Sequence, residues 1–208
     1  MAIGAYDLCL LTPSEIELDV VGQSIEAPRS LAGTTQAIDF SGGGFVIANY
    51  SGIQLVSAQQ HLYWNKLAAY LNGSVNYIAV PLWTDFISPA ATAHGVDGTL
   101  GADAAVNAGQ IVINFATAPL VGGEWFMINH GVAIGQRAYR ISDVISSAGT
   151  AYTVSIRPTL REAETSGHAV VFWRPSCRMR LAAGETMPWS WGAPGMIANV
   201  GLNLVEAF

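Results

Sequence analysis

Residues 122–181, GGEWFMINHGVAIGQRAYRISDVISSAGTAYTVSIRPTLREAETSGHAVVFWRPSCRMRL, decide the fold class of this chain. The stretch contains four apolar runs of strand length, separated by segments that are rich in turn residues. These runs are residues 125–128, 138–144, 152–156 and 169–173. Short apolar runs between turn residues are typical of β-strands, and the SAGT sequence at 147–150 is a hairpin signal. The stretch therefore predicts a compact β module.

Strand patterns continue on both sides of this module. Residues 15–21 alternate between acidic and apolar side chains, which is the period of a half-buried strand. Further runs at 45–50, 76–83, 111–115 and 197–207 have strand character. We expect the last of these to pair with the N-terminal sheet.

One segment, residues 57–72, has the composition and period of a helix. It contains good helix formers and no Gly or Pro, with Ser57 as the expected N-cap. Asn72 and Gly73 then supply the left-handed conformation that ends helices. The fold class that we predict is mainly β with this single helix.

A region of small residues, 88–110, predicts a connection between two β regions. We expect residues 1–88 and 176–208 to form a β-sandwich domain with the helix packed on it. Residues 89–175 are expected to form an inserted, peripheral domain that resembles a small β-barrel. A chain of 208 residues is long enough for each part to bury its own core.

The composition is poor in charge. Charged residues make up 12% of the chain, about half of the usual ~25%, while hydrophobic residues make up 51%. A surface with so little charge tends to associate. Two explanations stay open: a chain that is simply rich in Ala, Gly and Val, or a surface that neighbouring subunits cover.

The charge is also distributed unevenly. Residues 1–130 carry ten acidic and two basic residues, a net charge of −8, whereas residues 131–208 carry five acidic and seven basic residues, a net charge of +2. Such a molecule can pack head to tail, which is the geometry that closes rings, although the asymmetry can also be drift. The overall acidity argues against nucleic acid as the main ligand.

Motifs of catalysis and of cofactor binding are missing from the sequence. It has no GxSxG, no P-loop and no GxGxxG between a strand and a helix. The four histidines lack the spacing of metal ligands, and we expect His130 to lie in a turn. We therefore predict no enzyme activity, no cofactor and no metal site. A hydrolase with paired carboxylates is the least favoured alternative, with these candidates: Asp85, Asp97, Asp103 and Glu124.

Five arginines form the main charged cluster: Arg157, Arg161, Arg174, Arg178 and Arg180. Because Glu162, Glu164 and Glu185 are interleaved with them, the cluster favours ion pairs within the domain or between subunits over a phosphate or nucleic-acid patch.

Two tryptophans, Trp189 and Trp191, face the same side if their segment is a strand. They indicate either a subunit anchor or core wall, or a platform for carbohydrate.

The cysteines and the N-terminus bear on location. We expect Cys9 and Cys177 to be buried thiols, with a disulfide between them as the alternative. The N-terminal residues lack the basic region of a signal peptide, and no apolar run approaches the roughly 20 residues of a membrane span. The sequence thus predicts a chain made in a cytoplasm that reaches any later location by assembly.

The order of the motifs resembles a known family. HLYWNKLAAYLNG at 61–73, followed by NYIAVPLW at 76–83, resembles a segment of the tail-tip proteins of long-tailed bacteriophages. VNAGQIVIN, GGEWFMI, YRISDV, YTVSIRPTLREA and HAVVFWRPSCRMRL resemble the small β domain inserted in such proteins. VGLNLVEAF at 200–208 resembles their last sheet strand, so that the likeness covers most of residues 45–208.

This resemblance implies a distal tail protein of a phage, a prophage or a phage-derived gene transfer particle. In that family the β-sandwich domain and its helix form a hexameric ring at the virion tail tip, and the peripheral domain points outward. The implied partners are five further copies, the tail tube protein and the baseplate hub protein, with a tape-measure protein or a host-surface glycan as further candidates. DNA would pass through the lumen without specific binding. The alternative function is a carbohydrate-binding module for attachment to a host surface.

Overall fold

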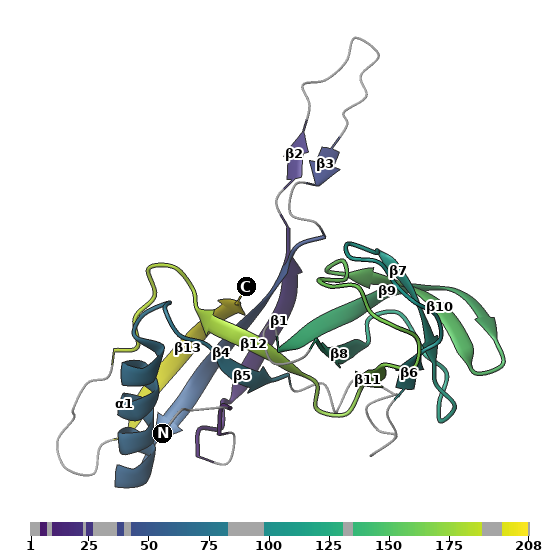
Figure 1. Ribbon diagram of the computed structural model, residues 1–208. Helices are drawn as coiled ribbons and strands as arrows, with labels where there is room; N and C mark the ends of the chain where they lie inside the picture. Colours follow the sequence, from purple (N-terminus) through teal and green to yellow (C-terminus); the bar gives the residue numbers. More distant parts are fainter. Residues whose placement is uncertain are drawn as a thin grey trace. The chain divides into compact units, whose positions relative to one another are not determined.

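The computed structural model describes residues 5–7, 10–22, 24–26, 37–39, 43–82, 98–130, 135–188 and 197–207. The described part of the chain contains thirteen strands and one helix. The prediction of a mainly β fold with a single helix and a small β-barrel is confirmed (Figure 1).

A five-stranded sheet contains both the earliest and the last of the strands. Its order is β1 (Glu15–Val21), β4 (Phe45–Leu55), β13 (Ala198–Glu206), β12 (Ser176–Leu181) and β5 (Ile78–Pro81). The pairs β4–β13, β13–β12 and β12–β5 are antiparallel. The expected pairing of the last strand with the N-terminal sheet is therefore confirmed. Beyond β5, Ala5 forms a parallel bridge to Ala79, which covers part of that edge.

Helix α1 (Ala58–Leu71) begins and ends where the sequence predicts. Ser57 Oγ accepts a hydrogen bond from the Gln60 backbone N–H at 3.2 Å, and Gln60 Oε1 accepts one from the Ser57 N–H at 2.9 Å. This reciprocal capping box satisfies two N–H groups that helical hydrogen bonds leave without partners. At the other end Asn72 and Gly73 have φ of 44° and 66°, which stops the helix.

The core of the sheet unit lies between α1 and one face of the sheet (Figure 1). Trp64, Leu67 and Leu71 of α1 are fully buried, and so are Tyr50 and Leu202, which oppose each other on β4 and β13. Each large apolar side chain buried in this way stabilises the fold by about 1.5–3 kcal/mol. A helix of fourteen residues is only marginally stable on its own, and the burial of its apolar face explains why α1 is stable in this protein.

Six other strands close into a barrel. In order around the barrel they are β10 (Ala151–Arg157), β7 (Gln110–Asn114), β6 (Gly98–Leu100), β11 (Ala169–Val171), β8 (Trp125–Asn129) and β9 (Gln136–Ala148). The predicted hairpin at 147–150 is confirmed: Gly149, with φ of 62°, and Thr150 connect β9 to β10. Two register shifts between β9 and β10 are β-bulges, which bend strands and help a small barrel to close.

Aromatic rings fill the barrel interior. The Phe115 and Phe172 ring centroids are 4.9 Å apart, and Phe126 lies 5.7 Å from Phe172 and 5.6 Å from Tyr139. All four rings are almost completely buried. The inside of the barrel is therefore a packed core, as is usual for small barrels.

A short pair of strands, β2 (Ser24–Glu26) and β3 (Ala37–Asp39), completes the described elements.

The chain divides into two compact units. The sheet unit comprises Met1–Asp19, Ile47–Leu82 and Ser176–Phe208, and the barrel unit comprises Val20–Val46 and Trp83–Pro175. The sequence prediction placed the inserted domain at 89–175, whereas the barrel unit also includes residues 20–46. Gly43 allows residues 43–46 to approach Thr159 closely within this unit, since a Cβ on Gly43 would lie 2.7 Å from the Thr159 nitrogen.

Candidate functional site

Four exposed apolar side chains lie before, on and after helix α1 in the sequence of the sheet unit. Val56 is 61% exposed, Leu62 70%, Val75 72% and Tyr77 45%. Exposed large apolar side chains are candidates for protein–protein contacts. We call these four residues the α1 surface.

The face of α1 that points away from the core explains the position of Leu62. Leu62, Lys66 and Ala69 are exposed, whereas Trp64, Leu67 and Leu71 on the opposite face are buried. The outward face of a surface helix normally carries several charges. Lys66 is the only Lys, Arg, Asp or Glu of α1, and Gln59 is also exposed, so Leu62 is the one large apolar side chain that the helix exposes.

Tyr77 is held in place by a predicted site residue. The Arg178 guanidinium carbon lies 3.2 Å from the centroid of the Tyr77 ring. Such cation–π contacts are worth roughly 0.5–2 kcal/mol, depending on solvent exposure. Arg178 therefore helps to fix the orientation of the ring within the α1 surface.

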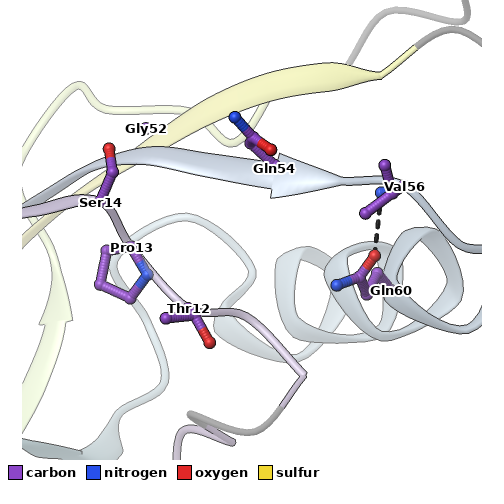
Figure 2. Close-up of a pocket in the computed structure, with 7 residues that line it drawn as sticks. All are labelled: Thr12, Pro13, Ser14, Gly52, Gln54, Val56 and Gln60. Carbon is purple, nitrogen blue, oxygen red and sulfur yellow. Dashed lines mark hydrogen bonds between the residues drawn. The ribbon is translucent and has the colours of Figure 1, made fainter.

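A hollow of about 400 Å³ lies beside the start of α1 (Figure 2). Val56 belongs both to the hollow and to the α1 surface. The amide of Gln60 organises its wall: Oε1 accepts from the Val56 N–H at 2.8 Å, and Nε2 donates to the Leu10 carbonyl at 3.0 Å. The residues that line the hollow are Thr12, Pro13, Ser14, Gly52, Gln54, Val56 and Gln60.

The chemistry of this hollow suits an uncharged partner that forms hydrogen bonds. Its seven lining residues supply hydroxyl and amide groups, and none of the seven is charged or aromatic. Carbohydrate sites rely on aromatic rings for stacking. The hollow thus lacks the aromatic platform that a sugar site would use.

Edge strand β1 carries a row of exposed carboxylates, Glu15, Glu17 and Asp19. Asn49 Nδ2 donates to Glu17 Oε2 at 3.1 Å, and Ser51 Oγ donates to Glu15 Oε2 at 3.0 Å. Charged side chains on an edge strand discourage pairing with unrelated strands. They also give this edge a charge that a basic surface can complement.

The five predicted arginines are divided between the units. Arg157, Arg161 and Arg174 belong to the barrel unit, and Arg178 and Arg180 belong to the sheet unit. Arg161 donates to the Gly44 carbonyl, and the Arg174 guanidinium carbon lies 5.1 Å from the centroid of the Trp173 ring. Their role at a subunit interface stays a prediction.

Five other predicted residues lie outside the described residues: Trp189, Trp191, Cys9, Asp85 and Asp97. The carbohydrate-binding alternative depends on Trp189 and Trp191, so it stays a prediction. The question of a Cys9–Cys177 disulfide therefore also stays open, although Cys177 is fully buried as predicted.

The barrel unit contains a buried polar network that the sequence reasoning missed. His130 Nδ1 contacts Glu164 Oε1, His168 Nδ1 contacts Glu164 Oε2, and His130 Nε2 lies 2.7 Å from the Tyr139 hydroxyl. The sequence predicts ion pairs of the interleaved acids within the domain or between subunits, and in the structure Glu164 contacts two histidines. The sequence offers one local indication of these contacts, the four-residue spacing of Glu164 and His168. That spacing predicts neighbouring side chains only in a helix, and this segment is not helical.

Within the described residues, no group of three or more His, Cys, Asp or Glu side chains is placed to hold a metal ion. No helix in the same part of the chain has the length and apolar character to cross a membrane.

Comparison with family models gives no match, and comparison with curated proteins gives none either. The likeness to distal tail proteins therefore depends on the sequence motifs quoted above.

Proposed function

We propose that this chain is a structural tail-tip protein of a long-tailed phage or a related particle. It forms a hexameric ring that joins the tail tube to the baseplate hub and surrounds the path of the DNA. The α1 surface carries the proposal, because it exposes large apolar side chains on the unit that is expected to form the ring. The choice of particle follows from the resemblance of the motifs.

The connectivity of the sheet unit supports the same proposal. Strands β5 and β12 are neighbours, with Pro81 opposite Ser176 and Ile78 opposite Met179. The barrel strands all lie in the chain between these two strands. An outer domain inserted between adjacent strands leaves the sheet intact, and it is the arrangement that the resemblance implies.

A closed ring requires that each copy present two different surfaces that fit each other. The sheet unit offers distinct chemistries for this purpose: the apolar α1 surface, the acidic row on β1 and the exposed Arg180 on β12. A stable interface buries about 800 Å² on each partner, with a few well-packed side chains providing most of the binding energy. We assign Leu62 and Val75 to that energetic centre.

The test is the mass of the purified full-length chain, measured by light scattering and mass photometry over a range of concentrations. The wild type is expected to form hexamers. Val75→Asp and Leu62→Glu place a charge at the centre of the contact and are expected to weaken each interface by at least about 1–2 kcal/mol, roughly tenfold or more.

Val106→Asp is the matched control. Val106 is 54% exposed and, like Val75, lies in a turn, but it belongs to the barrel unit. It is expected to assemble like the wild type. A wild type that stays monomeric at every concentration contradicts the proposal, and so does an equal loss of assembly in Val106→Asp and Val75→Asp.

A further inference from the structure

Arg180 of β12 is exposed on the face of the five-stranded sheet that points away from the core. Its neighbours Met179 and Leu181 are buried, and successive side chains of a strand alternate between its two faces. Arg178 lies on the same outer face, where its guanidinium covers the Tyr77 ring. Within the described residues Arg180 contacts no carboxylate, so its charge is available to a partner.

Glu15 and Glu17 of edge strand β1 lie on the same outer face. Glu15 Oε2 accepts from Ser51 Oγ and Glu17 Oε2 accepts from Asn49 Nδ2, and these two β4 residues flank the buried Tyr50 in the alternation of that strand. Both carboxylates are exposed, and their β4 partners are uncharged. Among the described residues neither carboxylate meets a cation, and the Oε1 atom of each is left for a further donor.

The two charged places of the outer face are too far apart to pair within one copy. Strands β4 and β13 lie between β1 and β12, and three strand spacings of about 4.8 Å amount to roughly 14 Å. Exposed charges at such a separation are largely screened at physiological salt, where the Debye length is about 8 Å. The outer face is therefore negative along the β1 edge and positive at Arg180.

A partner for this face must present a cation to β1 and an anion to Arg180. A polyanion such as nucleic acid suits Arg180 but is repelled by the β1 carboxylates, and a uniformly basic protein meets the opposite conflict. A second copy of this chain carries both signs. We propose that Arg180 of one copy forms an ion pair with Glu17 and Glu15 of the next copy, so that the copies associate head to tail.

This inference rests on the proposed function, because it names a charged contact between neighbouring copies of the ring. A head-to-tail contact uses two different surfaces of each copy, which is the kind of contact that closes rings. The guanidinium has five N–H donors and can bond to two carboxylate oxygens at once. Charge pairs at an interface chiefly determine register and the rate of association. Arg180 thus orients the copies, while the α1 surface contributes affinity.

The first test mixes two charge-reversal variants of the full-length chain. Arg180→Glu puts acid against acid at every contact, and Glu17→Arg puts base against base. Each variant alone is therefore expected to associate at least about tenfold more weakly than the wild type. In an equimolar mixture, alternating variants restore opposite charges at every contact, so the mixture is expected to assemble. Light scattering measures the mass in each sample, and circular dichroism checks that both variants are folded.

Asp143→Arg is the matched control. It makes the same change of charge as Glu17→Arg, on an exposed acid of the barrel unit, and is expected to assemble like the wild type. Two charge-reversal variants that each assemble like the wild type overturn the proposal. A mixture of folded variants that does not recover also overturns it, and so does an equal loss of assembly in Asp143→Arg.

The second test needs no variant. Association of the wild type is expected to weaken as salt rises, because screening reduces the attraction between exposed charges, and association that does not weaken overturns the proposal. The two proposals fail in different ways. A mixture that recovers as an assembly other than a hexamer contradicts the ring and supports the contact. Hexamers that form in the wild type and in every variant contradict the contact and support the ring.

Discussion

Gly52 shows how a single residue shapes the wall of the hollow beside α1. Its φ is +66°, and a Cβ at this position would lie 1.8 Å from Ser14 Oγ and 3.0 Å from Ser14 Cβ. Ser14 must stay close, because its backbone N–H donates to the Ser51 carbonyl at 3.1 Å. Two separate costs, one of backbone conformation and one of contact, thus disfavour any side chain here.

Gly73 allows the two costs to be separated, because it has the same φ of +66° and nothing within 4 Å of its added Cβ. We expect Gly73→Ala to lower the free energy of unfolding by about 1–2 kcal/mol, the cost of the left-handed conformation alone. Gly52→Ala should cost more, and Ser14→Ala added to it should recover part of the difference. Urea denaturation of the wild type and the three variants measures these free energies. Equal losses of stability in Gly73→Ala and Gly52→Ala would contradict a contact cost at Gly52.

At the scale of elements, the capping box determines where α1 begins. Ser57→Ala removes the acceptor of the Gln60 N–H and is expected to lower the free energy of unfolding by about 1 kcal/mol. Ser74→Ala is the control, since Ser74 is exposed in the turn after the helix and is expected to change stability by less than about 0.5 kcal/mol. Denaturant unfolding monitored by circular dichroism measures both. A loss in Ser57→Ala no larger than that of the control would show that the cap has no energetic role.

Elements whose signals are local could be predicted from the sequence. Ser57, Asn72 and the turn at Gly149 act through their own backbone neighbours, and each has the predicted role. The barrel closes through pairings between residues far apart in the chain, so the sequence indicates strands but not their order around the barrel. The contacts of Glu164 depend on the same closure, since its partner His130 lies thirty-four residues away. The α1 surface could not be predicted from the sequence, because Leu62 and Leu67 are the same residue type in the same helix and differ only in burial.

At the scale of the whole molecule, the α1 surface and the buried polar network lie in different units. The exposed apolar side chains of the α1 surface belong to the sheet unit, and the buried ionisable network belongs to the barrel unit. A cluster of buried residues that spans Leu100 to Phe172 gives the barrel unit a core of its own. The exposed apolar side chains of the α1 surface and the buried ionisable network therefore lie in different units, and each can be altered without touching residues of the other.

This separation leads to a prediction about where acid weakens the protein. Removal from water holds the pKa of His130 below its usual value of about 6.5. For each pH unit of that difference, acidification removes about 1.4 kcal/mol of stability. Amide hydrogen exchange of the full-length chain at pH 7.5 and pH 5.5, corrected for the intrinsic rates, locates that loss. Protection is expected to fall in β8, in β9 and at Arg161, whose N–H donates to Tyr139, while β4 and β13 keep theirs. Glu185→Gln should behave like the wild type. A uniform loss across both units would mean that acid acts on the protein generally and that His130 is not the sensitive point.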